Sequence, residues 1–305
     1  MLNNKSEIKL SVLGLRGSFG GVLQAYLETS QKEYKIITAD TSTSAGLSRF
    51  KASFPENFIE CGISEQSATA IATGISLEGQ NVYLGSFSPF IIGRSWEQIR
   101  LASYMEANLT IFGFGAGIGL SYLGYTHCSL EDCILINSIP NTRIFEPSIP
   151  SDTHRALALS EKYGGINYIR LLGDGPINRK IIENYEILDS NSRLYSYQSS
   201  RVIICSGYLL SRLFSQFSES INYDVISINQ ISGKGVDYSK ISNYIDKYEE
   251  IYCIHESYEN LIFNELQKYN NSNHIYNISP RKKFTKPGNF EYVSKNLNFD
   301  LSQFI

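Results

Sequence analysis

The stretch Asn57-Phe-Ile-Glu-Cys-Gly-Ile-Ser-Glu-Gln66 decides the fold of this chain, because it predicts a strand that turns directly into a helix. The strand runs to Gly62, and Ser64 is placed to cap the helix, since its hydroxyl can accept a bond from a free backbone N–H. Glu65 then lies in the first turn, where it either faces a cleft or only complements the helix dipole. The apolar face of this helix is expected to comprise Ala68, Ile71, Ala72 and Ile75, which recur at helical spacing.

The composition is that of a soluble globular protein with room for two domains. The chain has 305 residues, of which 42% are hydrophobic and 19% are charged, and its net charge is −3. This charge gives no reason to expect a nucleic acid or an anionic membrane as partner. No apolar run is long enough to span a bilayer, and the N-terminus has no charged-then-apolar signal pattern.

The five cysteines indicate reduced thiols, because their number is odd and no Cys-x-x-Cys pair is present. Reduced thiols predict a cytoplasmic location. His127 and Cys128 with Cys133 are an alternative as a metal site, but a tetrahedral site needs closer-knit pairs of ligands. We therefore expect no metal ligands in this chain.

Strands and helices alternate along the first half of the chain, which predicts a parallel sheet covered by helices on both faces. Besides the opening stretch, the expected strands cover 34–39, 81–87, 109–114, 143–145 and 166–171. The expected helices cover 19–29, 94–107, 129–137 and 151–163. Within the second of these helices, Arg94, Glu97 and Arg100 are expected to form ion pairs rather than to take part in chemistry.

A polar connection follows Gly173, and a second alternation begins at Arg201-Val-Ile-Ile-Cys-Ser-Gly207. Its later strands and helices are expected at 208–219, 223–228, 238–247, 250–255, 257–269 and 274–278. The sequence therefore predicts two three-layer α/β domains, residues 1–176 and a smaller domain of residues 177–305. The basic and then aromatic run from Arg281 to Phe290 is expected to be a solvated loop.

The motifs of the first domain resemble those of transketolases, above all the pyrimidine-binding domain in the short C-terminal subunits of split transketolases. The related deoxyxylulose-phosphate synthases share much of this pattern. The resemblance is strong from about Arg16 to Arg170, and the second domain is similar to the transketolase C-terminal domain. The motifs stand in the family's order at Thr43-Ser-Ala-Gly-Leu-Ser-Arg-Phe50, Phe54-Pro-Glu-Asn-Phe-Ile-Glu-Cys-Gly-Ile-Ser-Glu-Gln66, Ala70-Ile-Ala-Thr-Gly-Ile-Ser-Leu-Glu-Gly79, Ser86-Phe-Ser-Pro-Phe90, Arg94-Ser-Trp-Glu-Gln-Ile-Arg100, Gly124-Tyr-Thr-His-Cys-Ser-Leu-Glu-Asp132 and Ser138-Ile-Pro-Asn141.

The resemblance implies the cofactor thiamine diphosphate with Mg²⁺, which carries the hard organic step while the protein orients it. Glu65 stands where the family has the glutamate that binds N1′ of the aminopyrimidine, a role that needs a largely dry carboxyl. Phe87 and Phe90 stand where the family walls this ring, although two such aromatics are also typical of a core. A third family aromatic falls near Gly93. Asp40, which we place with the cofactor-binding residues, matches an acid at the mouth of the site.

The resemblance also implies substrate-binding residues. His127 matches a loop histidine that reaches the substrate carbonyl and hydroxyl, where an imidazole can polarise an oxygen or carry a proton. Arg16, Ser44 and Arg170 match positions that bind the sugar phosphate, for which guanidinium groups offer charge-assisted bonds. Glu65 and His127 are therefore the expected catalytic residues.

Two departures from the family pattern remove polar contacts to the substrate. Leu123 stands where the family has an aspartate that recognises a sugar hydroxyl, and Gly115 stands where many transketolases have a phosphate-binding histidine. The loss of such a hydrogen bond shifts specificity sharply, because unpaired polar groups are costly. We therefore expect a non-standard sugar substrate, as in a specialised or surface-polysaccharide pathway.

A complete transketolase also has a pyrophosphate-binding domain with the Mg²⁺ ligands, and we find no such pattern in this chain. Gly173-Asp-Gly175 is followed too closely by Asn178 for the family spacing and is expected to be a loop. The resemblance implies an N-terminal transketolase subunit as partner, in an α2β2 heterotetramer that takes a sugar or sugar phosphate. The implied activity is transfer of a two-carbon ketol unit from a ketose to an aldehyde. The alternatives are a carboligase that decarboxylates a 2-oxo acid and a catalytically dead scaffold subunit.

Overall fold

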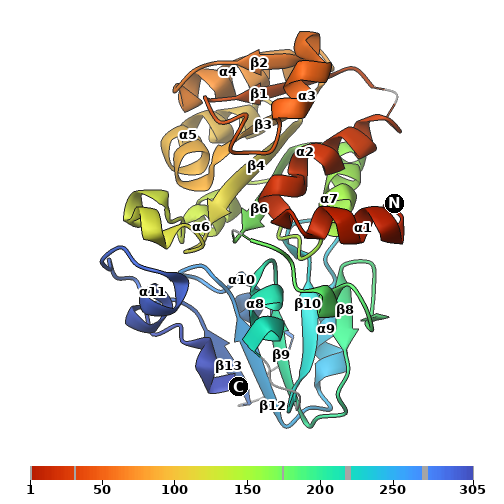
Figure 1. The fold of residues 1–305 in the computed structure, drawn as a ribbon, viewed down its shortest axis with the longest axis vertical. Coiled ribbons are helices and arrows are strands. Elements are labelled where there is room, and N and C mark those ends of the chain that lie inside the picture. Colours follow the sequence, from red (N-terminus) through yellow and green to blue (C-terminus); the bar gives the residue numbers. More distant parts are fainter. Residues whose placement is uncertain (1, 31, 174, 217–220, 270–273, 305) are drawn as a thin grey trace.

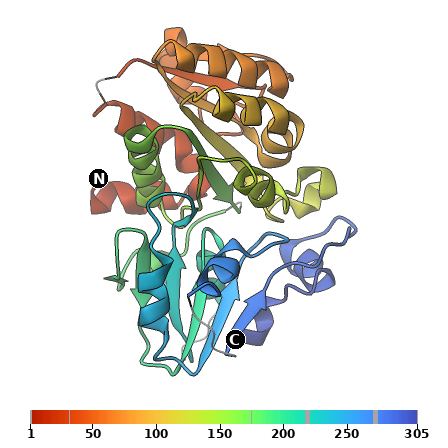
Figure 2. The same ribbon diagram turned by 180° about the vertical axis from the view of Figure 1, so that it is seen from behind.

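The computed structural model describes two α/β domains that lie one above the other in Figure 1. The first domain is drawn in red to green and the second in green to blue. Figure 2 shows the same arrangement from behind. The residues described are 2–30, 32–173, 175–216, 221–269 and 274–304.

The first domain is built on a seven-stranded sheet with the strand order β11-β5-β6-β4-β3-β1-β2. All neighbouring strands are parallel except β11, which runs antiparallel to β5. The strands are β1 (Tyr34–Thr38), β2 (Phe58–Glu60), β3 (Asn81–Phe87), β4 (Leu109–Ala116), β5 (Thr142–Phe145), β6 (Ile166–Leu172) and β11 (Gln230–Ser232). Every residue of the central strand β4 is buried, as is typical of a strand covered on both faces.

Helices cover both faces of this sheet, as the alternation of elements predicts. Helices α4 (Glu65–Leu77) and α5 (Ser88–Tyr104) contact each other on one face, and α2 (Gly14–Leu27) and α7 (Pro150–Tyr163) contact each other on the other. The remaining elements are α1 (Asn4–Ser11), α3 (Ser48–Ser53), α6 (Asp132–Asn137), η1 (Pro55–Asn57), η2 (Ser121–Leu123) and η3 (Tyr125–His127).

The second domain has a six-stranded mixed sheet with the order β13-β12-β9-β10-β8-β7. Strands β13, β12, β9 and β10 pair in parallel, and β8 runs antiparallel to both of its neighbours, β10 and β7. The strands are β7 (Glu186–Ile187), β8 (Ser192–Tyr195), β9 (Arg201–Cys205), β10 (Asp224–Ile228), β12 (Glu250–Ile254) and β13 (Ile275–Ile278). The helices are η4 (Arg179–Ile181), α8 (Leu209–Gln216), α9 (Tyr238–Ile245), α10 (Leu261–Leu266), α11 (Phe290–Asn296) and η5 (Leu301–Phe304).

The structure confirms the predicted α/β class, but β11 departs from the strict order of the domains. This strand belongs to the second half of the chain, yet it extends the first sheet. Residues 217–219 of the expected helix 208–219, and Asp174 of the expected loop, lie outside the described residues. In the part of the chain that the structure describes, no helix has the length and apolar character needed to cross a membrane.

Helix α4 begins directly after Ser64, but its cap and its buried face differ from the prediction. The Ser64 hydroxyl donates to Cys61 O at 2.8 Å instead of accepting from the first turn. Ile71 is 42% exposed. The buried face consists of small residues, which allow α4 to pack closely on α5: Ala68, Thr69, Ala72, Thr73 and Ser76.

A buried ionic network around Arg170 joins the two domains. Arg170 lies in β6, and its side chain is fully buried. Its Nε donates to Asp132 Oδ2 and its Nη1 to Glu146 Oε1, both at 2.7 Å. Its Nη2 donates to Ser129 O at 3.0 Å and to Glu256 O at 2.8 Å. The guanidinium thus binds carboxylates of the first domain and a backbone carbonyl of the second.

Glu146 carries this network further into the second domain. His255 Nε2 lies 3.0 Å from Glu146 Oε1, and the Ser206 hydroxyl donates to the other carboxylate oxygen. Burial alone would raise the pKa of Glu146, but His255 and Arg170 hold that pKa well below its ordinary value. The carboxylate therefore stays ionised inside the protein.

We predict that Arg170→Met lowers the free energy of unfolding by about 3–5 kcal/mol, because it leaves buried carboxylates without their cation. Chemical denaturation at neutral pH measures this change. Arg179→Met is the matched control, since Arg179 forms an exposed pair with Glu183 on one turn and should cost less than about 0.5 kcal/mol. Equal losses in the two variants would contradict the importance of the buried network.

Candidate functional site

Four parallel strands end at one edge of the first sheet, and the expected site residues follow those strand ends. Strand β1 leads to Asp40, β2 leads to Glu65, β3 ends at Phe87, and β4 leads to the loop of His127. In open parallel α/β sheets, ligands bind outside the carboxyl ends of the strands. The topology therefore brings these residues to the edge where binding is expected, and Figure 1 shows the strands concerned.

Glu65 is a buried acid at this edge. It is the first residue of α4 and is only 4% exposed. Arg94 Nη1 donates to both of its carboxylate oxygens, at 2.9 Å to Oε1 and 3.1 Å to Oε2. The Arg94 side chain is 50% exposed. The pair therefore joins a buried carboxylate to a cation that solvent reaches.

Aromatic rings stand beside this pair. The ring centroids of Phe87 and Phe90 are 5.9 Å apart, and the His127 ring packs edge-on against both, at 5.7 and 5.3 Å. Arg94 Cζ lies 4.3 Å from the centroid of Phe90. We call Glu65, Phe87, Phe90, Arg94 and His127 the carboxyl-edge cluster.

Arg94 is the member of this cluster that the sequence did not assign to the site. The predicted ion pair is present, but its partner is Glu65 in the site itself. Helix α5 begins at Ser88, six residues before the expected start, with Pro89 in its first turn. With the correct start, Phe90 and Arg94 are four residues apart on one side of the helix. This spacing is the sequence signal from which Arg94 could have been placed beside Phe90.

The loop after β4 is held by a segment of the second domain. Ser121 Oγ donates to Gly288 O at 2.9 Å, and Gly288 N donates to Ser121 O at 3.3 Å. The Phe284 ring packs edge-on against Tyr125 with centroids 4.6 Å apart, although Phe284 is 79% exposed. The run from Arg281 to Phe290 was expected to be solvated, but it contacts this loop. Figures 1 and 2 both show this part of the second domain reaching toward α6.

Asp40 and Ser44 lie in the loop after β1, at the same edge of the sheet. The backbone of Asp40 has a φ of 55°, and its N–H donates to Glu60 Oε1 at 2.6 Å. Gly46 of this loop packs on the first turn of α2, where a Cβ at Gly46 would lie 3.2 Å from Arg16 O. The structure thus places the segments of Arg16 and Ser44 side by side. Their binding roles stay predictions, as does that of Asp40.

The structure contradicts the expected phosphate-binding role of Arg170. All three of its guanidinium nitrogens donate within the interdomain network, and the side chain is fully buried. A phosphate could bind there only by displacing Asp132 or Glu146. The motif Tyr-Ile-Arg-Leu lies on a strand whose seven residues are all buried, and this position serves the domain junction instead.

The two departures from the family pattern leave apolar groups near the cluster. Gly115 has a φ of 65°, and a Cβ there would lie 2.3 Å from Leu120 Cδ1 and 3.4 Å from Phe87 Cδ1. Leu120 therefore fills the room next to Gly115, and a histidine at this position would need a different backbone. Leu123 ends η2 in the loop of His127 and is 48% exposed.

Cys133, Glu146 and His255 form a buried group at the domain junction, and their possible ligand atoms lie within 4.8 Å of one another. Glu146 Oε1 already accepts from Arg170 Nη1 at 2.7 Å. The positive charge of the Arg170 guanidinium, so close to Glu146 Oε1, would repel a metal cation at this oxygen. Hydrogen bonds account for this group, and we assign it to the interdomain network.

The five cysteines are free thiols. Cys128 directly follows His127, but burial raises its pKa to about 12. A thiol with this pKa is protonated at neutral pH and is a poor nucleophile. Cys128 is therefore not a candidate nucleophile at this edge.

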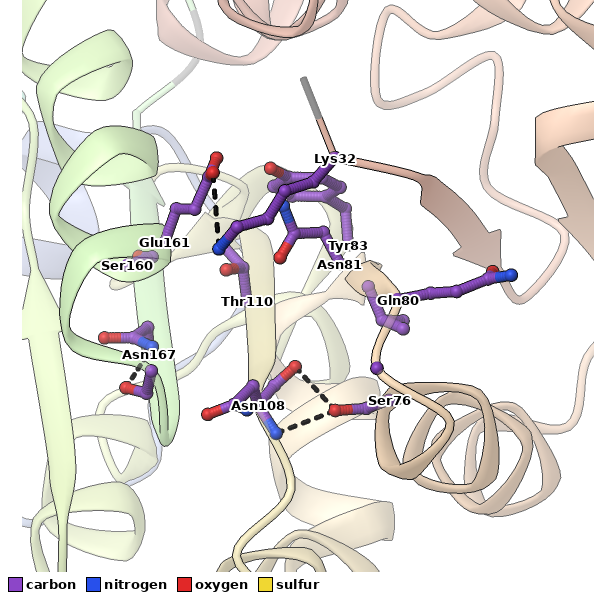
Figure 3. A pocket seen from close by; sticks show the side chains of 13 residues that line it. Lys32, Ser76, Gln80, Asn81, Tyr83, Asn108, Thr110, Ser160, Glu161 and Asn167 are labelled. Carbon is purple, nitrogen blue, oxygen red and sulfur yellow. Dashed lines mark hydrogen bonds and ion pairs between the residues drawn. The ribbon is translucent and has the colours of Figure 1, made fainter. Parts of the chain in front are cut away.

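A polar cavity of about 140 Å³ lies at the opposite, amino-terminal edge of the same sheet (Figure 3). Lys32 Nζ faces Glu161 Oε1 at 3.4 Å, and the Ser76 hydroxyl bonds to the backbone N–H and carbonyl of Asn108. The residues that line it are Lys32, Ser76, Gly79, Gln80, Asn81, Val82, Tyr83, Asn108, Thr110, Ser160, Glu161, Gly164 and Asn167. The expected site residues are not among these described lining residues, so this cavity is separate from the cluster.

Similar solved structures share the fold of nearly the whole chain. The chain superposes on a structure described as "Split gene transketolase, inactive beta4 tetramer" with a TM-score of 0.75 and 21% identity, over 93% of both chains. A transketolase from Campylobacter jejuni gives a TM-score of 0.72 and 18% identity, over 95% of this chain and 45% of that one. At these identities the likeness concerns the fold alone.

Sequence comparisons identify the family to which the chain belongs. A putative transketolase C-terminal section from Methanocaldococcus jannaschii is 33% identical over 164 residues, which is 52% of each chain. One of the subunits of apulose-4-phosphate transketolase from Actinobacillus succinogenes is 32% identical over 138 residues, 45% of this chain and 44% of that protein. The matched part thus spans about half the length of these relatives. The model of the family "Transketolase, pyrimidine binding domain" matches residues 13–171, more than half of the chain. The chain therefore belongs to the transketolase pyrimidine-binding domain family.

Proposed function

We propose that this chain is the pyrimidine-binding, C-terminal subunit of a split transketolase that depends on thiamine diphosphate. The proposed reaction transfers a two-carbon ketol unit from a ketose to an aldehyde acceptor. The observation that carries this proposal is the carboxyl-edge cluster, in which a buried acid stands beside an aromatic wall and an imidazole. Membership of the family supports it, as do the names of the relatives.

The residues of the cluster fit the aminopyrimidine of this cofactor. The contacts of the Arg94 guanidinium support this proposal, because that group is flat, lies over Phe90 and donates N–H bonds to Glu65. An aminopyrimidine is also flat and also presents nitrogen at its edge. Glu65 would hold the ring nitrogen and share a proton with it, and Phe87 and Phe90 would cover the ring. When bound, thiamine diphosphate supplies the chemistry that breaks and forms the carbon–carbon bond.

We assign His127 the role of contacting the substrate. Its ring packs edge-on against Phe87 and Phe90, and its Nδ1 lies 3.0 Å from Thr126 Oγ1. These contacts fix the orientation of the imidazole. We assign its Nε2 to donate a proton to, or accept one from, a substrate oxygen, which is a common role of histidine near neutral pH.

A second polypeptide is proposed to hold the diphosphate and Mg²⁺, because we assign no ligands for them in this chain. The similar split-gene transketolase is described as an inactive beta4 tetramer, and the Actinobacillus relative is named as one subunit of a transketolase. Ile63, Tyr122 and Leu123 are exposed apolar residues beside Glu65 and in the loop of His127. Exposed apolar groups around a functional site are typical of a docking face. We propose an N-terminal transketolase subunit as the partner, in an α2β2 assembly.

The substrate is proposed to be a non-standard sugar of a specialised or surface-polysaccharide pathway. Leu123 and Gly115 offer no hydrogen bond where the family has polar side chains, and Arg170 is engaged at the domain junction. A deoxy, keto or nucleotide-linked sugar suits such a site. The apolar Leu123 also keeps a second reaction open, in which a 2-oxo acid is decarboxylated and joined to an aldehyde.

Glu65→Gln should lower kcat of the assembled complex at least about 100-fold, because the amide keeps the shape of the acid but cannot exchange the proton. Glu97→Gln is the matched control, since Glu97 is an exposed acid on α5 and should keep full activity. Size-exclusion chromatography checks that both variants still assemble with the partner. Full activity of an assembled Glu65→Gln complex would show that this carboxyl is not the activating acid.

Leu123→Asp should change the choice of substrate without unfolding the chain, because Leu123 is exposed. We predict that the ratio of kcat/KM for a ketose phosphate to kcat/KM for pyruvate rises about tenfold, because the new carboxylate can accept a bond from a sugar hydroxyl. Steady-state assays with a ketose phosphate and with pyruvate, each with an aldehyde acceptor, measure this ratio. Leu77→Asp, an exposed leucine at the other end of α4, controls for the added charge. An unchanged ratio would remove Leu123 from the determinants of specificity.

A further inference from the structure

We propose that Arg94 occupies the place of the cofactor's pyrimidine in the free subunit and leaves it when the cofactor binds. This inference rests on the proposed function, because it concerns the regulation of the same site. Two contacts carry it. The same guanidinium donates to both oxygens of Glu65 and lies 4.3 Å from the centroid of Phe90.

These two contacts use the groups that a pyrimidine would need. A flat ring bound to Glu65 and packed on Phe90 would overlap with the Arg94 guanidinium, since both would lie on one face of Phe90 while reaching one carboxylate. The pyrimidine and the guanidinium therefore compete. Binding of the ring requires the arginine side chain to move.

The structure leaves Arg94 free to make this movement. Its side chain is 50% exposed, so it can rotate into solvent without disturbing the core. A Cβ at the preceding Gly93 would meet no atom within 4 Å, so the surface of α5 next to Arg94 in the chain is open. The backbone stays in place, because Arg94 O lies in α5 and accepts from Gln66 Nε2 at 3.1 Å. The exchange is thus a change of side-chain rotamer.

Burial of Glu65 explains why an arginine stands there. A carboxylate that is 4% exposed is costly unless a cation or a hydrogen-bond donor faces it. Arg94 supplies that donor in the free subunit, and the pyrimidine would supply it in the complete enzyme. A consequence is that the subunit alone binds the cofactor weakly, because binding must first displace Arg94. Contacts from the partner subunit then favour the exchange.

The test uses the full chain without a partner and 4-amino-5-hydroxymethyl-2-methylpyrimidine, the pyrimidine part of the cofactor, as the probe. Calorimetry or ligand-observed NMR measures its Kd. Arg94→Met and Arg94→Gln should both bind the probe about tenfold more tightly than the natural chain, as expected if Arg94 occupies the place about nine-tenths of the time. Arg100→Met is the matched control, since Arg100 lies on the same helix near Trp96 and should leave the Kd unchanged.

The result that overturns the inference is equal or weaker binding by both Arg94 variants, including no binding at all. Thermal unfolding shows whether each variant is folded. A double-mutant cycle of Glu65→Gln and Arg94→Met in unfolding tests the contact itself, with an expected coupling of about two- to fivefold in the unfolding equilibrium. Additive effects would show that the ion pair does not form in solution.

Glu65→Gln separates this inference from the proposed function. If Glu65→Gln binds the probe as well as the Arg94 variants do, Glu65 does not hold the pyrimidine, and the proposed function fails. If Glu65→Gln loses binding while the Arg94 variants bind no better than the natural chain, the cofactor site stands and only the displacement of Arg94 is wrong.

Discussion

Arg170 is buried where the two domains meet, and its guanidinium binds groups from both of them. The loop of His127 depends on this junction. Ser129 O accepts from Arg170, and Leu130 O accepts from Ser257 Oγ of the second domain at 2.8 Å. Ile118 N donates to Glu256 Oε1, also of the second domain, at 2.6 Å. Both ends of the loop are thus tied to the second domain. The second domain therefore positions a residue of the candidate site, although the site itself lies on the first sheet.

The carboxyl-edge cluster is suited to one half of a cofactor site. Glu65, Phe87 and Phe90 provide an acid and an apolar wall, which suit a ring with polar nitrogens. A second surface that closes over such a site would exclude water from it. In the proposed assembly, this chain has to pair its buried acid with a donor until the cofactor and the partner subunit bind. Arg94 meets this requirement from the same helix as the wall.

Much of this arrangement could be predicted from the sequence, because spacing along a helix and alternation of elements are local properties. The start of α4 at Glu65 and the succession of parallel strands follow from such patterns. The resemblance to transketolases named Phe87, Phe90 and His127, and the topology of a parallel sheet explains why they converge.

The features that were missed depend on contacts between distant parts of the chain. The burial of Arg170 requires carboxylates from two other segments, and β11 joins a sheet that begins about two hundred residues earlier. Ile71 was expected to be buried, but packing of small residues against α5 turned it to the surface. Arg94 was missed because helix boundaries are the least certain part of a sequence prediction.

The most direct measurement is a calorimetric titration of thiamine diphosphate with Mg²⁺ into this chain alone and into its mixture with an N-terminal transketolase subunit. We predict tight binding in the mixture and none of comparable strength to the chain alone, since each subunit would hold one part of the cofactor. Tight binding to the chain alone would contradict a shared site. Absence of binding by a mixture that forms a stable assembly would show that the cluster is not a cofactor site.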